Sequence, residues 1–184
     1  MAYIALATAA PGIVGPMQTY PQVARILNDL ADALLVNDQG ISRHERELIA
    51  AYVSWGNRCH FCHRSHRAFA EAVALPDELN RIQSLFDANE PPDVAGLSPK
   101  LQALLALAEQ VRADATQVTA DHMEAARRHG ADDHTLHDTV LIAALFGLFN
   151  RYVDGLGTYA PEPGAPYYSE AADRTTAVGY AASV

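Results

Sequence analysis

Apolar residues recur at helical spacing along most of the chain, and no convincing run of alternating β-branched residues is present. The segment 20–36 is typical, because its apolar side chains would form one stripe of an amphipathic helix: Val23, Ile26, Leu27, Leu30 and Leu34. Ser42 and Glu45 then have the spacing of a capping box, which predicts a second helix from Ser42 to about Trp55. The pattern therefore predicts an all-α protein.

Capping residues, glycines and prolines divide the remaining chain into further helices. We expect them from about Cys59 to before Pro76, from Pro76 to about Phe86, from Ser98 and Pro99 to about Ala113, from Thr119 to Gly130, and from Asp132 or Asp133 to about Val153. DANEPPDVAGLSP, at 87–99, is the clearest loop. The last part, about 155–184, is rich in Gly, Pro and Tyr where it begins, so we expect an extended C-terminal tail.

The length and composition fit one domain over residues 1–184, because 184 residues that are 49% hydrophobic can bury a sizeable core. With 22 acidic and 13 basic residues, the average field repels nucleic acid and anionic membranes. The apolar run 140–149 has about half the length of a membrane span, and the start of the chain lacks a basic leader. We therefore expect a single-domain helical bundle that is soluble and cytoplasmic.

Both cysteines of the chain lie in one short stretch, CHFCHRSH, with Cys59 at the expected start of a helix. Backbone N–H groups at such a position stabilise a thiolate. Cys62 lies on the same helical face, close enough to form a disulfide with Cys59, and His66 follows one turn later. A thiol with an imidazole in reach has the pattern of an activated nucleophile and its base. His63 likewise follows Cys59 by four residues, one helical turn later.

Glu47 lies on an otherwise apolar segment, ELIAAYVSW, in the helix before the cysteines. A carboxylate on an inward stripe needs a partner, and a histidine of the next helix is at hand. Glu45 is better placed as the capping residue and Arg46 as a surface residue. We therefore place Glu47 in the candidate site.

Metal binding is an alternative use of the same residues. Cys59, Cys62 and either His63 or His66 supply three ligands of the type that zinc prefers, but a closed structural site requires a fourth. A catalytic site with one open position needs only three. An inert cysteine pair is the remaining interpretation.

The segment 42–75 resembles the core motif of the alkylhydroperoxidase D branch of the carboxymuconolactone decarboxylase superfamily. The spacing E-x11-C-x-x-C-x3-H is filled here by Glu47, Cys59, Cys62 and His66. Further along, LFNRYVDGLGTYAPE, at 148–162, resembles the C-terminal part of the peroxidase-related subgroup. Together these stretches cover the middle of the chain and part of its C-terminal third.

The resemblance implies an all-helical subunit that assembles as a trimer or hexamer and acts as a thiol-dependent peroxidase without a bound cofactor. It implies that Cys62 attacks a hydroperoxide and that Cys59 then resolves the sulfenic acid to a disulfide. Glu47 and His66 would relay protons. An external dithiol, such as a lipoyl group on a partner protein, would reduce the disulfide.

Some family members carry a histidine between the cysteines, where this chain has Phe61. His63 projects in another direction and does not replace that histidine, so we expect Phe61 to be a packing residue or a wall of the pocket, with His63 close by. Asn150, Arg151 and Asp154 at the end of the most apolar helix are further candidates for the thiol pocket of this or an adjacent subunit; alternatively, Arg151 pairs with Asp154.

Two other functions remain open at this point. The first is a lactone decarboxylase like other members of the superfamily, a chemistry that does not require a dithiol. The second is a non-enzymatic oligomer that holds a metal or senses redox state through Cys59 and Cys62.

Overall fold

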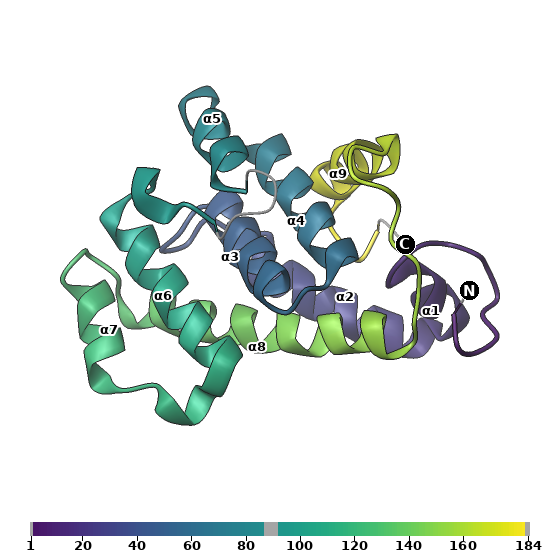
Figure 1. Cartoon of the computed structure of the whole chain (residues 1–184), viewed down its shortest axis with the longest axis horizontal. Helices are drawn as coiled ribbons and strands as arrows, with labels where there is room; N and C mark the ends of the chain where they lie inside the picture. The colour runs from purple at the N-terminus through teal and green to yellow at the C-terminus, as the bar shows by residue number, and fades with distance from the viewer. Residues whose placement is uncertain (1, 87–91, 183–184) are drawn as a thin grey trace.

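A computed structural model describes residues 2–86 and 92–182, and every regular element in this part of the chain is helical (Figure 1). The helices are α1 (Val14–Thr19), α2 (Pro21–Leu35), α3 (Arg43–Gly56), α4 (His60–Val73), α5 (Pro76–Leu85), α6 (Pro99–Asp114), α7 (Ala120–Arg127), α8 (Asp133–Gly155) and α9 (Pro166–Val178). Short 3₁₀ turns cover Val94–Gly96 and Ala115–Gln117. The predicted all-α bundle is confirmed, while part of the expected loop, 87–91, lies outside the described residues.

The helices begin at the predicted capping residues. Glu45 accepts a hydrogen bond from the backbone N–H of Ser42 at 2.9 Å, which forms the expected capping box of α3. Ser98 and Asp132 accept backbone hydrogen bonds at the starts of α6 and α8. These short-range bonds satisfy N–H groups that have no partner inside the helix, so the local sequence is sufficient to set these boundaries.

Two features near the ends of the chain differ from the prediction. The short helix α1 lies in the proline-containing start, and α9 occupies much of the segment that was expected to be extended. Pro166 stands in the first turn of α9, where its fixed φ and missing N–H are tolerated. Tyr168, Ala171 and Ala172 are buried, and α9 packs against α4. This tertiary packing stabilises α9, whereas the glycine- and proline-rich residues before it led to the prediction of an extended segment.

Helix α4 occupies a central position, between α3 and α9, with Cys59 at its N-cap and Cys62 in its first turn. The long helix α8 runs along the lower edge in Figure 1 and packs against α3 and α6. Buried residues such as Ile49, Leu104, Ile142 and Phe146 join these helices in the main core. Among the described residues, no helix is both long and apolar enough to span a membrane.

The prediction that Arg46 is a surface residue is wrong. Its side chain is fully buried, and its Nη1 lies 2.7 Å from Oδ2 of Asp138 on α8. Further hydrogen bonds from this guanidinium reach the backbone oxygens of Leu34, Gln39 and Ile41. Periodicity could not reveal this role, because the arginine is buried only through partners distant in sequence.

Candidate active site

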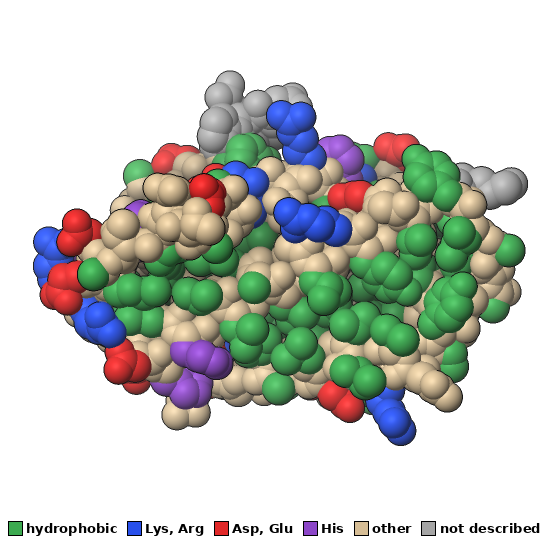
Figure 2. All heavy atoms as spheres, turned by 90° about the horizontal axis from the view of Figure 1, so that it is seen from below, with side chains coloured by type: hydrophobic (Ala, Val, Ile, Leu, Met, Phe, Trp, Pro, Cys, Tyr) green, Lys and Arg blue, Asp and Glu red, His purple; other side chains and the backbone are tan. Residues whose placement is uncertain are grey.

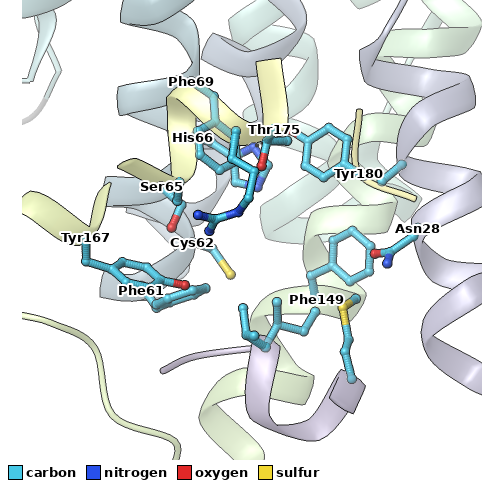
Figure 3. Close-up of a pocket in the computed structure, with 16 residues that line it drawn as sticks. Asn28, Phe61, Cys62, Ser65, His66, Phe69, Phe149, Tyr167, Thr175 and Tyr180 are labelled. Atoms are coloured by element: carbon cyan, nitrogen blue, oxygen red, sulfur yellow. Dashed lines mark hydrogen bonds between the residues drawn. The ribbon is translucent and has the colours of Figure 1, made fainter. Parts of the chain in front are cut away.

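The two thiols are positioned by a sharp turn between α3 and α4. Arg58 has a left-handed backbone with φ of 61°, and the next N–H, that of Cys59, donates to the carbonyl of Ser54. Cys59 is the N-cap of α4 and Cys62 lies in its first turn. Both thiols are free and buried, and the Cys62 sulfur points into a cavity (Figure 3).

The surroundings of Cys62 favour its protonated form. A hydrogen bond with Cys59 and burial raise the pKa of the Cys62 thiol well above its ordinary value, and a hydrogen bond from Asn150 only partly opposes them. The helix start therefore does not suffice to ionise Cys62. Its conversion to a nucleophilic thiolate requires a base when the reaction partner arrives.

A buried histidine and carboxylate lie beside this thiol. Nδ1 of His66 is 2.7 Å from Oε2 of Glu47, and the two side chains are 10% and 1% exposed. A carboxylate accepts hydrogen bonds, so Nδ1 carries the donated proton and Nε2 is left to exchange a proton with another group. The fold thus brings together the carboxylate and imidazole of the predicted motif.

Tyr180 is a third member of this hydrogen-bonded group. Its hydroxyl donates to Oε1 of Glu47 at 2.6 Å and lies 3.4 Å from Nδ1 of His66. Burial and the charge of Glu47 raise the pKa of the Tyr180 phenol well above its ordinary value, so it stays protonated. Sequence reasoning missed this residue, because no motif joins position 180 to position 47.

Cys62 and His66 border the same cavity, which lies between α1, α2, α4, α8 and α9 (Figure 3). Most of its wall is apolar or aromatic and includes Met17, Phe61, Phe69, Phe149 and Tyr167. Phe61 forms part of this wall, as expected, and its ring lies 6.0 Å from that of Tyr167. The thiol thus faces a largely apolar space to which Asn28, Ser65 and Arg174 add polar groups.

Of the pocket residues predicted at the end of α8, Asn150 contacts Cys62 and Arg151 does not. Asn150 is buried, donates to Oγ of Ser54 at 3.0 Å and also bonds to Cys62. Arg151 is exposed and donates to the carbonyl of Gly147 on its own helix, so it does not belong to the cavity. Arg151 thus lies outside the thiol cavity of its own subunit.

Asp154, the alternative partner predicted for Arg151, instead forms a hydrogen bond with Cys59. Burial raises the pKa of the Asp154 carboxyl, and the bond with Cys59 partly offsets this effect. The carboxyl group is therefore the polar neighbour of the first thiol, as Asn150 is of the second.

His63 lies on the other side of α4. Its Nδ1 is 3.1 Å from the carbonyl oxygen of Ala51, and its ring packs edge-on against Phe86. Burial lowers the pKa of His63 to about 4, so the imidazole is neutral around neutral pH. His63 and Cys59 border a second groove, which also includes Arg58, Arg64 and Arg112. The two thiols thus contact different surface features.

Metal-ligand geometry is not found in this part of the chain. Among the described residues, no three His, Cys, Asp or Glu side chains come together in an arrangement that could hold a metal ion. Nδ1 of His66 is bonded to Glu47 and Nδ1 of His63 to the carbonyl of Ala51, so each ring has only Nε2 left as a possible ligand atom. The zinc interpretation gains no support from this geometry.

Comparisons with known proteins agree with this fold. Residues 21–84 match the model of the carboxymuconolactone decarboxylase family. The alkylhydroperoxidase AhpD core of an uncharacterised peroxidase-related protein from Ralstonia eutropha JMP134 is 26% identical; the alignment covers 87% of this chain and 80% of that one, with a TM-score of 0.69. The fold is also similar to that of an uncharacterised peroxidase-related protein from Silicibacter sp. TM1040, at 21% identity, coverage of 86% and 78%, and a TM-score of 0.70.

No curated protein gives a significant match to the sequence. Residues 21–84 therefore resemble the carboxymuconolactone decarboxylase family, and the subunit has the alkylhydroperoxidase D-like fold of these solved structures.

Proposed function

We propose that this protein is a thiol-dependent peroxidase that reduces organic hydroperoxides through Cys62 and Cys59. The observation that carries the proposal is the shared cavity: the Cys62 sulfur points into it, and His66, held by Glu47, borders it. A nucleophile, a base and a residue that orients the base are the three groups that activated thiol chemistry requires.

The reaction begins when His66 accepts the Cys62 proton through Nε2, directly or through a molecule in the cavity. The Cys62 thiolate attacks the terminal oxygen of the hydroperoxide, the O–O bond breaks, and the alkoxide takes a proton to leave as an alcohol. Cys62 is thereby oxidised to a sulfenic acid. The Cys59 thiol then attacks the Cys62 sulfur, which forms the disulfide and releases water.

An external dithiol completes the cycle. It transfers two electrons and two protons to the Cys59–Cys62 disulfide and becomes a disulfide itself, so no bound cofactor is needed. A lipoyl group on a partner protein has this chemistry. Cys59 borders the groove that includes Arg58 and Arg64, on a different side of α4 from the peroxide cavity, which suits separate approaches of the two substrates.

We also propose that the subunit assembles with further copies of itself. Hydrophobic side chains gather over much of the face that Figure 2 shows, which is the lower side of Figure 1. Large exposed apolar side chains of the subunit include Val23 (52%) and Ile26 (65%) on α2 and Leu148 (48%) on α8. Contiguous apolar surface of this kind favours a subunit interface. Light scattering should give the mass of an oligomer, and Ile26→Asp should reduce it, whereas Leu75→Asp, at an exposed helix start, should not.

The redox function is tested by titrating free thiols before and after one equivalent of cumene hydroperoxide, with intact mass and metal content read on the same sample. We expect both thiols and the mass of two hydrogens to be lost, and dihydrolipoamide to restore them. Cys62→Ser should not react. In Cys59→Ser, a sulfenic-acid trap should label Cys62.

Other outcomes would favour the alternatives. Unreactive thiols together with stoichiometric zinc would identify a metal site. Oxidation that changes the assembly without turnover would identify a redox sensor. Lactone decarboxylation that survives in the Cys59→Ser/Cys62→Ser variant would identify a lactone enzyme.

A further inference from the structure

The chain beyond α9 is held against two other helices. Both carboxylate oxygens of Asp32 on α2 accept backbone N–H groups, those of Tyr180 at 2.6 Å and Ala181 at 3.0 Å. Arg43 on α3 donates to the carbonyls of Thr175 and Thr176 at the end of α9. These bonds fix the direction in which the chain leaves α9.

Gly179 makes this attachment sterically feasible. Its φ is +81°, in the region that favours glycine, and a Cβ built there would lie 2.8 Å from Oδ1 of Asp32. The glycine therefore allows both the left-handed turn after α9 and the close approach of Asp32 to the following N–H groups. The turn places Tyr180 beside the active site.

The Tyr180 side chain lies within the Glu47–His66 group. Its hydroxyl donates to Oε1 of Glu47 at 2.6 Å, while Nδ1 of His66 donates to Oε2, so each carboxylate oxygen accepts one hydrogen bond. The phenol ring is stacked on the imidazole, with ring centres 6.0 Å apart and an interplanar angle of 16°. Figure 3 shows Tyr180 and His66 on neighbouring segments above the Cys62 sulfur.

We propose that Tyr180 is a positioning residue of the active site, and that docking of residues 179–181 onto Asp32 completes the site. This inference rests on the proposed peroxidase function. Tyr180 holds Oε1 of Glu47, which keeps Oε2 directed at His66 and preserves the tautomer whose Nε2 accepts the Cys62 proton. A buried carboxylate with an unoccupied oxygen is costly, so loss of the phenol hydroxyl destabilises this arrangement.

The phenol is suited to positioning rather than to proton transfer. Because burial and Glu47 raise the pKa of Tyr180, the hydroxyl keeps its proton and remains a donor throughout the cycle. Its contact with Cys62 is indirect, through Glu47 and His66. The effect of Tyr180 on the thiol should therefore disappear when His66 is replaced.

The test compares Tyr180→Phe with Tyr167→Phe, because both variants lose a phenol hydroxyl from a residue that lines the same cavity. Tyr180→Phe keeps the ring against His66. We expect it to slow oxidation of Cys62 by cumene hydroperoxide about tenfold to a hundredfold, as for loss of one hydrogen bond to a charged group. Tyr167→Phe should stay within about twofold of the parent protein, since its hydroxyl holds no charged group.

Two further measurements separate positioning from general destabilisation. The Nδ1–H proton resonance of His66, assigned by ¹⁵N-histidine labelling and a His66→Gln variant, should broaden or shift in Tyr180→Phe but not in Tyr167→Phe. Asp32→Asn leaves the active-site side chains intact and weakens the hydrogen bonds that hold residues 180 and 181. It should therefore cause part of the slower Cys62 oxidation and part of the change in the His66 resonance. In a His66→Gln background, Tyr180→Phe should cause no further loss of rate.

An unchanged oxidation rate together with an unchanged His66 resonance in Tyr180→Phe would overturn the inference. Equal losses in Tyr180→Phe and Tyr167→Phe would also overturn it. If the parent protein does not react with hydroperoxide, the peroxidase proposal fails, while the His66 resonance still tests whether Tyr180 holds the Glu47–His66 pair.

Discussion

Oε2 of Glu47 and Nδ1 of His66 lie 2.7 Å apart, although the two residues are 19 positions apart and belong to different helices. Glu47 has no exposed surface, and His66 is nearly as buried. In this environment a short bond to a carboxylate fixes both the orientation and the tautomer of an imidazole. The α3–α4 contact is therefore the structural basis of the proposed proton transfer from Cys62.

Replacement of Glu47 by Gln should slow the reaction of Cys62 with hydroperoxide by about 10²-fold or more, because an amide can donate to Nδ1 and so stabilise the wrong tautomer. Stopped-flow oxidation kinetics measure the effect. Glu45→Gln, on the same helix, is the control: it weakens the cap of α3 but leaves the active site intact. Equal kinetics of the two variants would contradict the assigned role.

Replacement of Cys59 by Ala should lower the pKa of Cys62, because the hydrogen bond with Cys59 is the largest cause that raises it. The rate of alkylation by iodoacetamide should then reach its plateau at lower pH than in the parent protein. Asn150→Ala should act in the opposite direction, since the Asn150 hydrogen bond lowers the same pKa. Shifts of the same sign in both variants would refute this explanation of the Cys62 environment.

Protonation of His63 should destabilise the fold in acid. Its pKa is about 4 in the folded protein, whereas the ordinary value is about 6.5, so the unfolded chain binds the additional proton between these limits. The contribution of neutral, buried His63 to the free energy of unfolding is complete above pH 6.5, the pKa of an ordinary histidine. It is lost as the pH falls toward about 4, the pKa of His63 in the folded protein. Urea unfolding should show a loss of about 3 kcal/mol between about pH 6.5 and pH 4, which His63→Gln reduces.

His129→Gln removes an exposed histidine and is the matched control for that experiment. It should leave the pH dependence of the free energy of unfolding unchanged. A parallel loss of stability in the parent protein and in His63→Gln would show that other groups cause the acid sensitivity.

The buried pair between Arg46 and Asp138 should be important for stability. Burial alone would raise the pKa of Asp138, but hydrogen bonds from His137 and Arg46 hold it below its usual range. Arg46→Met should cost about 3–5 kcal/mol in free energy of unfolding, because the buried Asp138 carboxylate loses its guanidinium partner. Arg46→Met/Asp138→Leu should recover part of this loss.

Arg67→Met offers a comparison, because Arg67 pairs with Glu71 at a partly exposed position. Denaturant titration should show a cost of about 1 kcal/mol or less for that variant. Similar costs for Arg46→Met and Arg67→Met would mean that burial of the Arg46 pair contributes little.

The sequence predicted most helix boundaries because they depend on neighbours within one or two turns. Ser42 and Glu45 cap α3 through bonds that span three residues, and Cys62 and His66 share a face of α4 through helical spacing alone. Glu47 could be selected for the candidate site because a carboxylate on an apolar stripe needs a partner. The same reasoning misassigned Arg46, whose partner on α8 lies far along the chain.

The sequence by itself thus determined the all-helical class and the spacing of the thiols, imidazole and carboxylate. Only the tertiary structure decided which of these groups meet, because such contacts depend on how α3, α4, α8 and α9 pack rather than on local hydrogen bonds. The hydrogen bond with Cys59 and burial in the packed core raise the pKa of Cys62 and keep this thiol protonated. Packing also brings Tyr180, from the far end of the chain, within hydrogen-bonding distance of Glu47.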